Sequence, residues 1–143
     1  MDKLPLFNGT PEIQNEEFEK YLNYLNYNFN DSSKEKSGYV IFKDKKIVFI
    51  MDIGNSSDVK YSKKYQSGCL SFEITSNKEK LICNLGFDIN KSSKIKLLSK
   101  TTAAHSTLYL NNRSSCIFNN IYPTKIYGEN KLSEGLKVMK KKN

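Results

Sequence analysis

Residues 69–84, which read CLSFEITSNKEKLICN, decide the fold that we expect for this chain. Apolar and polar residues alternate along the first half of this stretch, as is typical of a half-buried β-strand. The apolar set is Leu70, Phe72 and Ile74, and the polar set is Ser71, Glu73 and Thr75. A second apolar run follows the polar residues 76–79, so a hairpin of residues 69–75 and 80–84 is predicted.

The chain after Gly38 repeats this pattern of short apolar runs and polar breaks. We expect hairpins of residues 39–43 with 46–51 and of 107–110 with 115–118, and short strands at 125–127 and 136–139. Repeated hairpins at this spacing favour a sandwich over a βαβ arrangement. Two long segments, 52–68 and 85–102, are expected to be loops, where binding groups tend to lie.

One helix is expected, over residues 16–27. Its apolar residues fall at i, i+3, i+4 and i+7, namely Phe18, Tyr21, Leu22 and Leu25. The sequence therefore predicts an all-β fold, an incomplete β-sandwich of antiparallel sheets with one short N-terminal helix. Residues 1–37 are expected to form a linker and the helix, and residues 38–143 a truncated sandwich, because the strand-like run 137–140 would lack a partner.

The 143 residues carry a net charge of +8, which attracts polyanions in general. Charge does not distinguish nucleic acid from acidic polysaccharide, and the lysines are scattered except at Lys140, Lys141 and Lys142. No nucleic-acid motif is present, so specific nucleic-acid binding is not expected. The chain also shows no signal peptide and no stretch long enough to span a membrane.

Few residues suggest catalysis or metal binding. Three cysteines, Cys69, Cys83 and Cys116, lack CxxC spacing and are expected to be buried free thiols. The single histidine, His105, precedes a predicted strand, and a lone histidine is more often structural than catalytic. There is no Walker loop, GxGxxG or HExxH motif.

Several pieces of the chain occur in a characteristic order. They are LPLFNG at residues 4–9, GCLSFE at 68–73, NLG at 84–86 and AAHSTL at 103–108. This set resembles the C-terminal β-domain of heparinase II/III-like polysaccharide lyases, in particular a bacterial subgroup. The resemblance implies an enzyme with an N-terminal (α/α) toroid and a C-terminal stack of antiparallel sheets, and its relatives are often periplasmic.

Enzymes of this kind cleave acidic polysaccharides, glycosaminoglycans among them, by β-elimination: a base removes the proton α to the uronate carboxylate and an acid protonates the leaving oxygen. The family's catalytic tyrosine lies in the toroid, which this chain does not encode. We therefore expect part of a lyase that is inactive alone, either a truncated gene product or a chain whose partner is a separately encoded toroid domain. The alternative is a non-catalytic β-sandwich module that binds acidic glycans.

The resemblance also implies a zinc site in relatives, built from a histidine before the LSFE strand, an acidic residue in the next turn and the AHSTL histidine. Here Gln66 and Asn84 stand at the first two positions, and only His105 remains. Amide oxygens bind Zn²⁺ weakly, so no tightly bound zinc and no other cofactor is expected. Gln66, Asn84 and His105 are instead expected to form a hydrogen-bonded polar cluster, which we favour over a catalytic site.

A second candidate site lies in the segment 60–65, where tyrosines alternate with lysines. Tyr61, Lys64 and Tyr65 could stack on a sugar ring and pair with its carboxylate. A solvated loop with ordinary aromatic anchors would have the same sequence, so both readings stay open.

Overall fold

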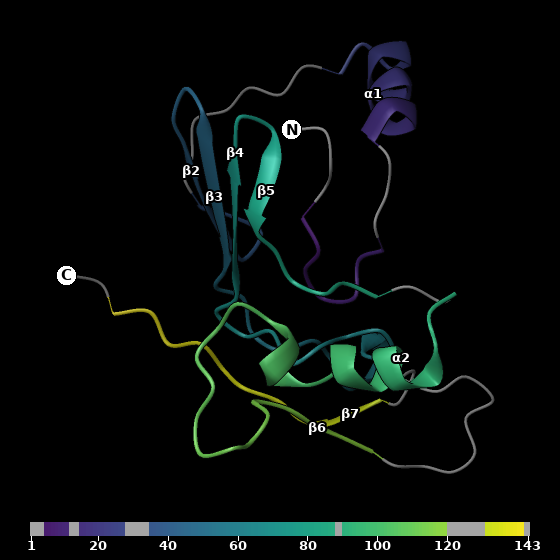
Figure 1. Cartoon of the computed structure of the whole chain (residues 1–143), viewed down its shortest axis with the longest axis vertical. Coiled ribbons are helices and arrows are strands. Elements are labelled where there is room, and N and C mark those ends of the chain that lie inside the picture. Colours follow the sequence, from purple (N-terminus) through teal and green to yellow (C-terminus); the bar gives the residue numbers. More distant parts are fainter. Residues whose placement is uncertain (1–4, 12–14, 28–34, 88–89, 120–130, 142–143) are drawn as a thin grey trace.

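The computed structural model describes residues 5–11, 15–27, 35–87, 90–119 and 131–141, and its centre is a five-stranded antiparallel sheet (Figure 1). The strands follow one another in sequence order: β1 Glu35–Lys36, β2 Tyr39–Lys43, β3 Ile47–Asp52, β4 Phe72–Ser76 and β5 Glu79–Ile82. A separate pair, β6 Ile117–Phe118 and β7 Leu132–Glu134, is also antiparallel. The predicted antiparallel sheets are therefore confirmed.

Two predicted hairpins form, the second with shifted bounds: β4 begins at Phe72 and not at Cys69, because residues 69–70 form a turn in which Leu70 has a φ of 58°. Strands β2 and β3 pair from Tyr39↔Asp52 to Lys43↔Val48. Strands β4 and β5 are joined by Asn77 and Lys78, whose φ angles are 49° and 72°. Two successive positive φ values are the mark of the two-residue turn that matches the twist of a hairpin.

Strand β4 buries its polar side, which reverses the usual arrangement of a half-buried strand. Glu73 and Thr75 of β4 are 1% and 3% exposed, whereas Phe72 on the opposite side is only half-buried. On that opposite side the rings of Phe42, Phe49 and Phe72 form a ladder, with centroids 6.0 and 5.7 Å apart. The polar side is covered because the N-terminal residues cross it, and the backbone N–H of Leu6 donates to Glu73.

The third predicted hairpin is wrong. Residues 107–110 and 115–118 do not pair as strands, and only one isolated bridge joins Leu110 to Arg113. The first of these segments is instead held along the start of β4, where Ser106 accepts from the backbone of Phe72 and Thr107 donates to the carbonyl of Cys69. Residues 117–118 pair with β7 instead.

One of the two short strands expected nearer the C-terminus is wrong. Residues 136–139 form no strand; Leu136 makes two hydrogen bonds with Ser56, and Val138 makes one with Asn55. The strand expected at 125–127 lies outside the described residues.

The predicted N-terminal helix is confirmed as α1 Asn15–Tyr24, which ends before the expected residue 27. A second helix, α2 Ser93–Ser99, lies in the segment expected to be a loop, and Ser92 caps its N-terminus by accepting from the backbone of Ile95. The expectation of an all-β chain is therefore wrong: helices and antiparallel sheets are combined, and the described sheets do not close into a sandwich. Two short 3-10 turns, η1 Val59–Tyr61 and η2 Thr102–Ala104, complete the described elements.

A small apolar core lies under the second sheet, where Tyr65, Cys116 and Leu132 pack together with Phe118 beside them. Figure 1 shows β6, β7 and α2 gathered at one end of the five-stranded sheet. All three cysteines are free, but Cys83 is exposed rather than buried because it directly follows the edge strand β5. Within the described ranges, no helix has the length and apolar character needed to cross a bilayer.

Candidate functional site

One of the polar residues named from the sequence, Asn84, lies against a buried carboxylate, that of Glu73. We call Glu73, Asn84 and Ser106 the Glu73 cluster. Oε1 of Glu73 accepts from the backbone N–H of Leu6 at 2.9 Å and from the backbone N–H and side-chain amide of Asn84 at 3.1 and 3.3 Å. In the sequence, this site could have been found from an acidic residue in the middle of a predicted strand that is followed by an Asn-x-Gly turn.

The second carboxylate oxygen of Glu73 has a different environment. Oε2 lies 3.3 Å from the ammonium group of Lys80 on the neighbouring strand, whose side chain is 14% exposed. This contact lacks the geometry of a directed hydrogen bond, so the attraction is mainly between the opposite charges.

Gln66 and Asn84 both hold backbone groups in place. Gln66 is fully buried; its Oε1 accepts from the backbone N–H of Gly9 at 3.1 Å and its Nε2 donates to the carbonyl of Gly86 at 2.7 Å. Oδ1 of Asn84 accepts from the backbone N–H and hydroxyl of Ser106 at 3.2 and 3.3 Å. Their amides therefore join segments that are far apart in sequence.

His105 points away from both amides. Its Nε2 lies 2.9 Å from the carbonyl of Ser99, and because a carbonyl only accepts, Nε2 carries the hydrogen. Burial lowers the pKa of His105, and the bond to Ser99 partly opposes that shift, so the imidazole is neutral near pH 7. No hydrogen bond joins the ring to Gln66 or Asn84; only the next residue, Ser106, reaches Asn84.

The residues at the expected zinc positions do not fit a zinc ion. Among the described residues, no three histidine, cysteine or acidic side chains converge. The Gln66 and Asn84 oxygens already accept backbone N–H groups, and ligation would break those bonds. The expectation of no tightly bound zinc stays a prediction for metal analysis of the purified protein.

The second candidate site is divided between surface and core. Tyr65 is 5% exposed and packs against Cys116 and Leu132, so its ring has no open face for a sugar. Burial also raises the pKa of its hydroxyl, against a smaller opposing effect of a hydrogen bond with Ser56. Tyr61, by contrast, is 74% exposed, and Lys64 is exposed too. Sugar binding by Tyr61 and Lys64 stays a prediction.

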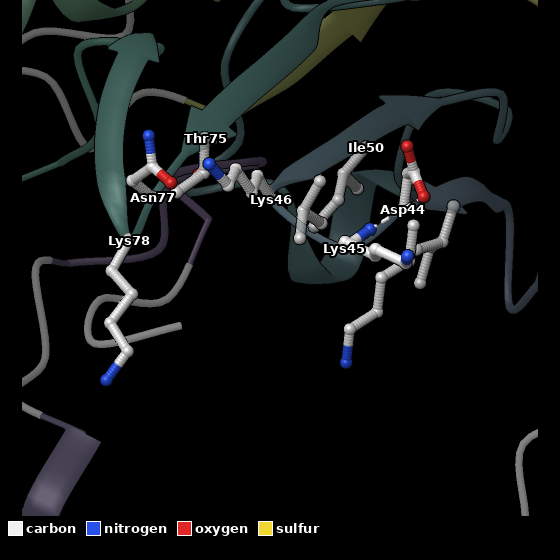
Figure 2. A pocket seen from close by; sticks show the side chains of 10 residues that line it. Asp44, Lys45, Lys46, Ile50, Thr75, Asn77 and Lys78 are labelled. Carbon is white, nitrogen blue, oxygen red and sulfur yellow. Dashed lines mark hydrogen bonds between the residues drawn. The ribbon is translucent and has the colours of Figure 1, made fainter.

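A pocket that the sequence analysis did not anticipate lies where the tips of the two hairpins meet. We call it the hairpin-tip pocket; its volume is about 610 Å³. Its lining residues are Ile41, Lys43, Asp44, Lys45, Lys46, Val48, Ile50, Thr75, Asn77 and Lys78. Figure 2 shows Thr75 and Asn77 of one hairpin beside Lys46 of the other, and the backbone N–H of Asn77 donates to the carbonyl of Lys46 at 2.8 Å.

Comparison with known proteins gives one match. The family model described as "Heparinase II/III-like, C-terminal" matches residues 28–142, a range that includes every described strand, the Glu73 cluster and the hairpin-tip pocket. Neither the curated proteins nor the solved structures contain a significant match to the chain.

Proposed function

The chain belongs to the heparinase II/III-like family through its C-terminal domain, and on that basis we propose that it is part of a lyase that cleaves acidic polysaccharides by β-elimination and is inactive alone. The observation that carries this proposal is the family match over residues 28–142. β-Elimination needs a base for the proton α to the uronate carboxylate, an acid for the leaving oxygen and stabilisation of the enolate-like intermediate.

The surroundings of the described polar residues support inactivity of the isolated chain. The imidazole of His105 is neutral but is fixed to the Ser99 carbonyl and packed beside Gly68. The amides of Gln66 and Asn84 are committed to backbone groups, and Tyr65 is in the core. We propose that a toroid domain supplies the base and the acid and that residues 28–142 contribute to polysaccharide binding.

A second candidate function is a non-catalytic module that binds acidic glycans. The net charge of +8 favours it, because a cationic surface raises the local concentration of polyanions. The structural roles of Gln66, Asn84 and His105 favour it as well, because none of these side chains is left available for proton transfer.

The two functions are separated by an activity assay. The chain is incubated with heparin, chondroitin sulfate or alginate, alone and together with the toroid domain of a heparinase II/III-like lyase, and the unsaturated uronate product is followed by its ultraviolet absorbance. We expect product only from the mixture or from a fusion of the two. Product from the chain alone would contradict inactivity, and a mixture that stays inactive while the chain binds glycan favours the binding module.

A further inference from the structure

We propose that the hairpin-tip pocket binds the carboxylate or sulfate group of an acidic oligosaccharide. This inference rests on the proposed function for the sugar, whereas the preference for an anion comes from the pocket's own residues. Neither the family match nor the residues named from the sequence single out this position, which lies at the far end of strands β2–β4 from the residues 66–71.

The sheet register builds the pocket floor. Lys43, Val48 and Thr75 lie in one row across three strands, since Lys43 pairs with Val48 and Val48 pairs with Thr75. Ile41 and Ile50 are opposite each other two residues further along, on the same side of the sheet. An aliphatic floor of this kind can contact the C–H face of a sugar ring while charged groups at the rim contact its substituents.

The hydroxyl of Thr75 is the observation that points to a ligand. Thr75 is 3% exposed, and its Oγ1 is buried without a hydrogen-bond partner. Its row neighbours do not satisfy it, because Val48 is apolar and Lys80 lies against Glu73. Buried hydroxyls without a partner are rare in folded proteins. Figure 2 shows the side chain of Lys46 beside Thr75, and because this lysine is exposed, a ligand oxygen that takes its place would reach Oγ1.

The rim of the pocket is cationic. Its charged lining residues are Lys43, Lys45, Lys46, Lys78 and Asp44, four cations against one carboxylate. Lys43, Lys45 and Lys46 are exposed, and none of them forms an ion pair with a described residue. Ammonium groups that converge on one space attract an anion. The volume of about 610 Å³ is within the range of small-molecule sites.

The test uses isothermal titration calorimetry on the full chain with a heparin hexasaccharide at physiological salt, and neutral maltohexaose as the comparison ligand. The double variant Lys43→Gln/Lys46→Gln removes two rim charges, and Lys91→Gln/Lys94→Gln removes two exposed charges near α2. The pocket variant loses two lysine charges that would pair with anionic groups of the hexasaccharide, so its affinity for the hexasaccharide should fall about fivefold to tenfold. The affinity of the control variant should fall about twofold or less.

Thr75→Val provides a readout that is independent of charge. Valine keeps the branched shape and removes the unpartnered hydroxyl, so the midpoint of thermal unfolding should stay the same or rise while hexasaccharide affinity falls about threefold or more. Equal weakening by the two double variants, or unchanged affinity in all pocket variants, overturns the pocket while the proposed glycan binding stands. Failure of the unmodified chain to bind the hexasaccharide overturns both the pocket and the proposed binding role.

Discussion

Glu73 shows how one residue connects three parts of the chain. Its carboxylate lies inside the sheet at 1% exposure, where an unpaired charge would be costly, and it is compensated by Leu6, Asn84 and Lys80. Because Leu6 belongs to the N-terminal segment and Asn84 follows β5, loss of this carboxylate would loosen both segments from β4 at once.

Replacing Glu73 tests that role. Glu73→Gln keeps an acceptor oxygen but removes the charge opposite Lys80, and we expect the free energy of unfolding to fall by about 1–3 kcal/mol. Urea denaturation followed by circular dichroism measures the change. Glu79→Gln, an exposed position at the start of β5, is the matched control and should change stability by about 0.5 kcal/mol or less. Equal changes in the free energy of unfolding for the two variants would show that Glu73 has no special structural role.

His105 provides a pH-dependent test at the same scale. Its pKa is lowered below the ordinary 6.5 in the folded protein, so the unfolded chain binds the proton more readily. The stability that comes from the neutral ring is complete above pH 6.5 and is lost as the pH falls through the folded pKa. His105→Gln, which can still donate to Ser99, should flatten this part of the stability profile in denaturation series at decreasing pH.

Comparing that variant with the unmodified protein separates the contribution of His105 to the pH dependence of stability from the contribution of Asp52. Burial raises the pKa of Asp52, so protonation of its carboxyl favours the folded state at low pH, with the opposite sign. Both proteins keep Asp52, and its contribution cancels in the difference. Identical pH profiles of the two proteins would show that the ring is not held neutral.

At the scale of elements, strand β4 and its turn show what local sequence decides. The alternation of residues 72–75 lies within the strand, but its buried side is chosen by the N-terminal segment that crosses it. The turn is decided locally: Asn77 tolerates a positive φ well, whereas Lys78 at 72° pays a steric cost that glycine would not.

Lys78→Gly is therefore expected to stabilise the hairpin, because Asn-Gly is the preferred pair for this turn. The free energy of unfolding should rise by about 0.5–1 kcal/mol. Lys46→Gly, in the neighbouring turn and without a positive φ, is the control and should leave stability unchanged or lower it. Thermal unfolding of the two variants measures the change. A lower unfolding midpoint for Lys78→Gly would contradict the view that the positive φ of Lys78 destabilises the turn.

At the scale of the whole molecule, the apolar side of the five-stranded sheet is the most conspicuous surface. Phe42 and Ile47 on this side are 49% and 50% exposed, next to the partly buried rings of Phe49 and Phe72. Contiguous apolar surface of this kind promotes association between proteins.

We expect the isolated chain to self-associate through this face as its concentration rises. Phe42→Lys/Ile47→Lys should shift the sedimentation coefficient toward that of the monomer in analytical ultracentrifugation, because two charges would have to be desolvated in the contact. Leu108→Lys/Tyr109→Lys adds the same charge and removes two exposed apolar residues that belong to none of the strands, and it should not restore the monomer to the same extent. Equal effects would indicate that net charge alone controls association.

Some of this protein is determined by local sequence. The hairpin of residues 39–52, the turn within residues 76–79 and the helical spacing after Asn15 depend on neighbours within a few residues, and each formed where it was expected. The strand expected from Cys69 begins only at Phe72. The motifs LSFE, NLG and AAHSTL are likewise local, and they indicate the same family that matches residues 28–142.

Other features depend on contacts between residues that are far apart in the chain. Pairing of β6 with β7, burial of Glu73 under the N-terminal segment, and the turning of His105 toward Ser99 are each decided by which distant segment packs alongside. The hairpin-tip pocket exists because Asn77 and Lys46 join two hairpin tips. Such contacts form where the whole chain can both bury side chains and satisfy their hydrogen bonds. For this reason the polar side of β4 is the buried one.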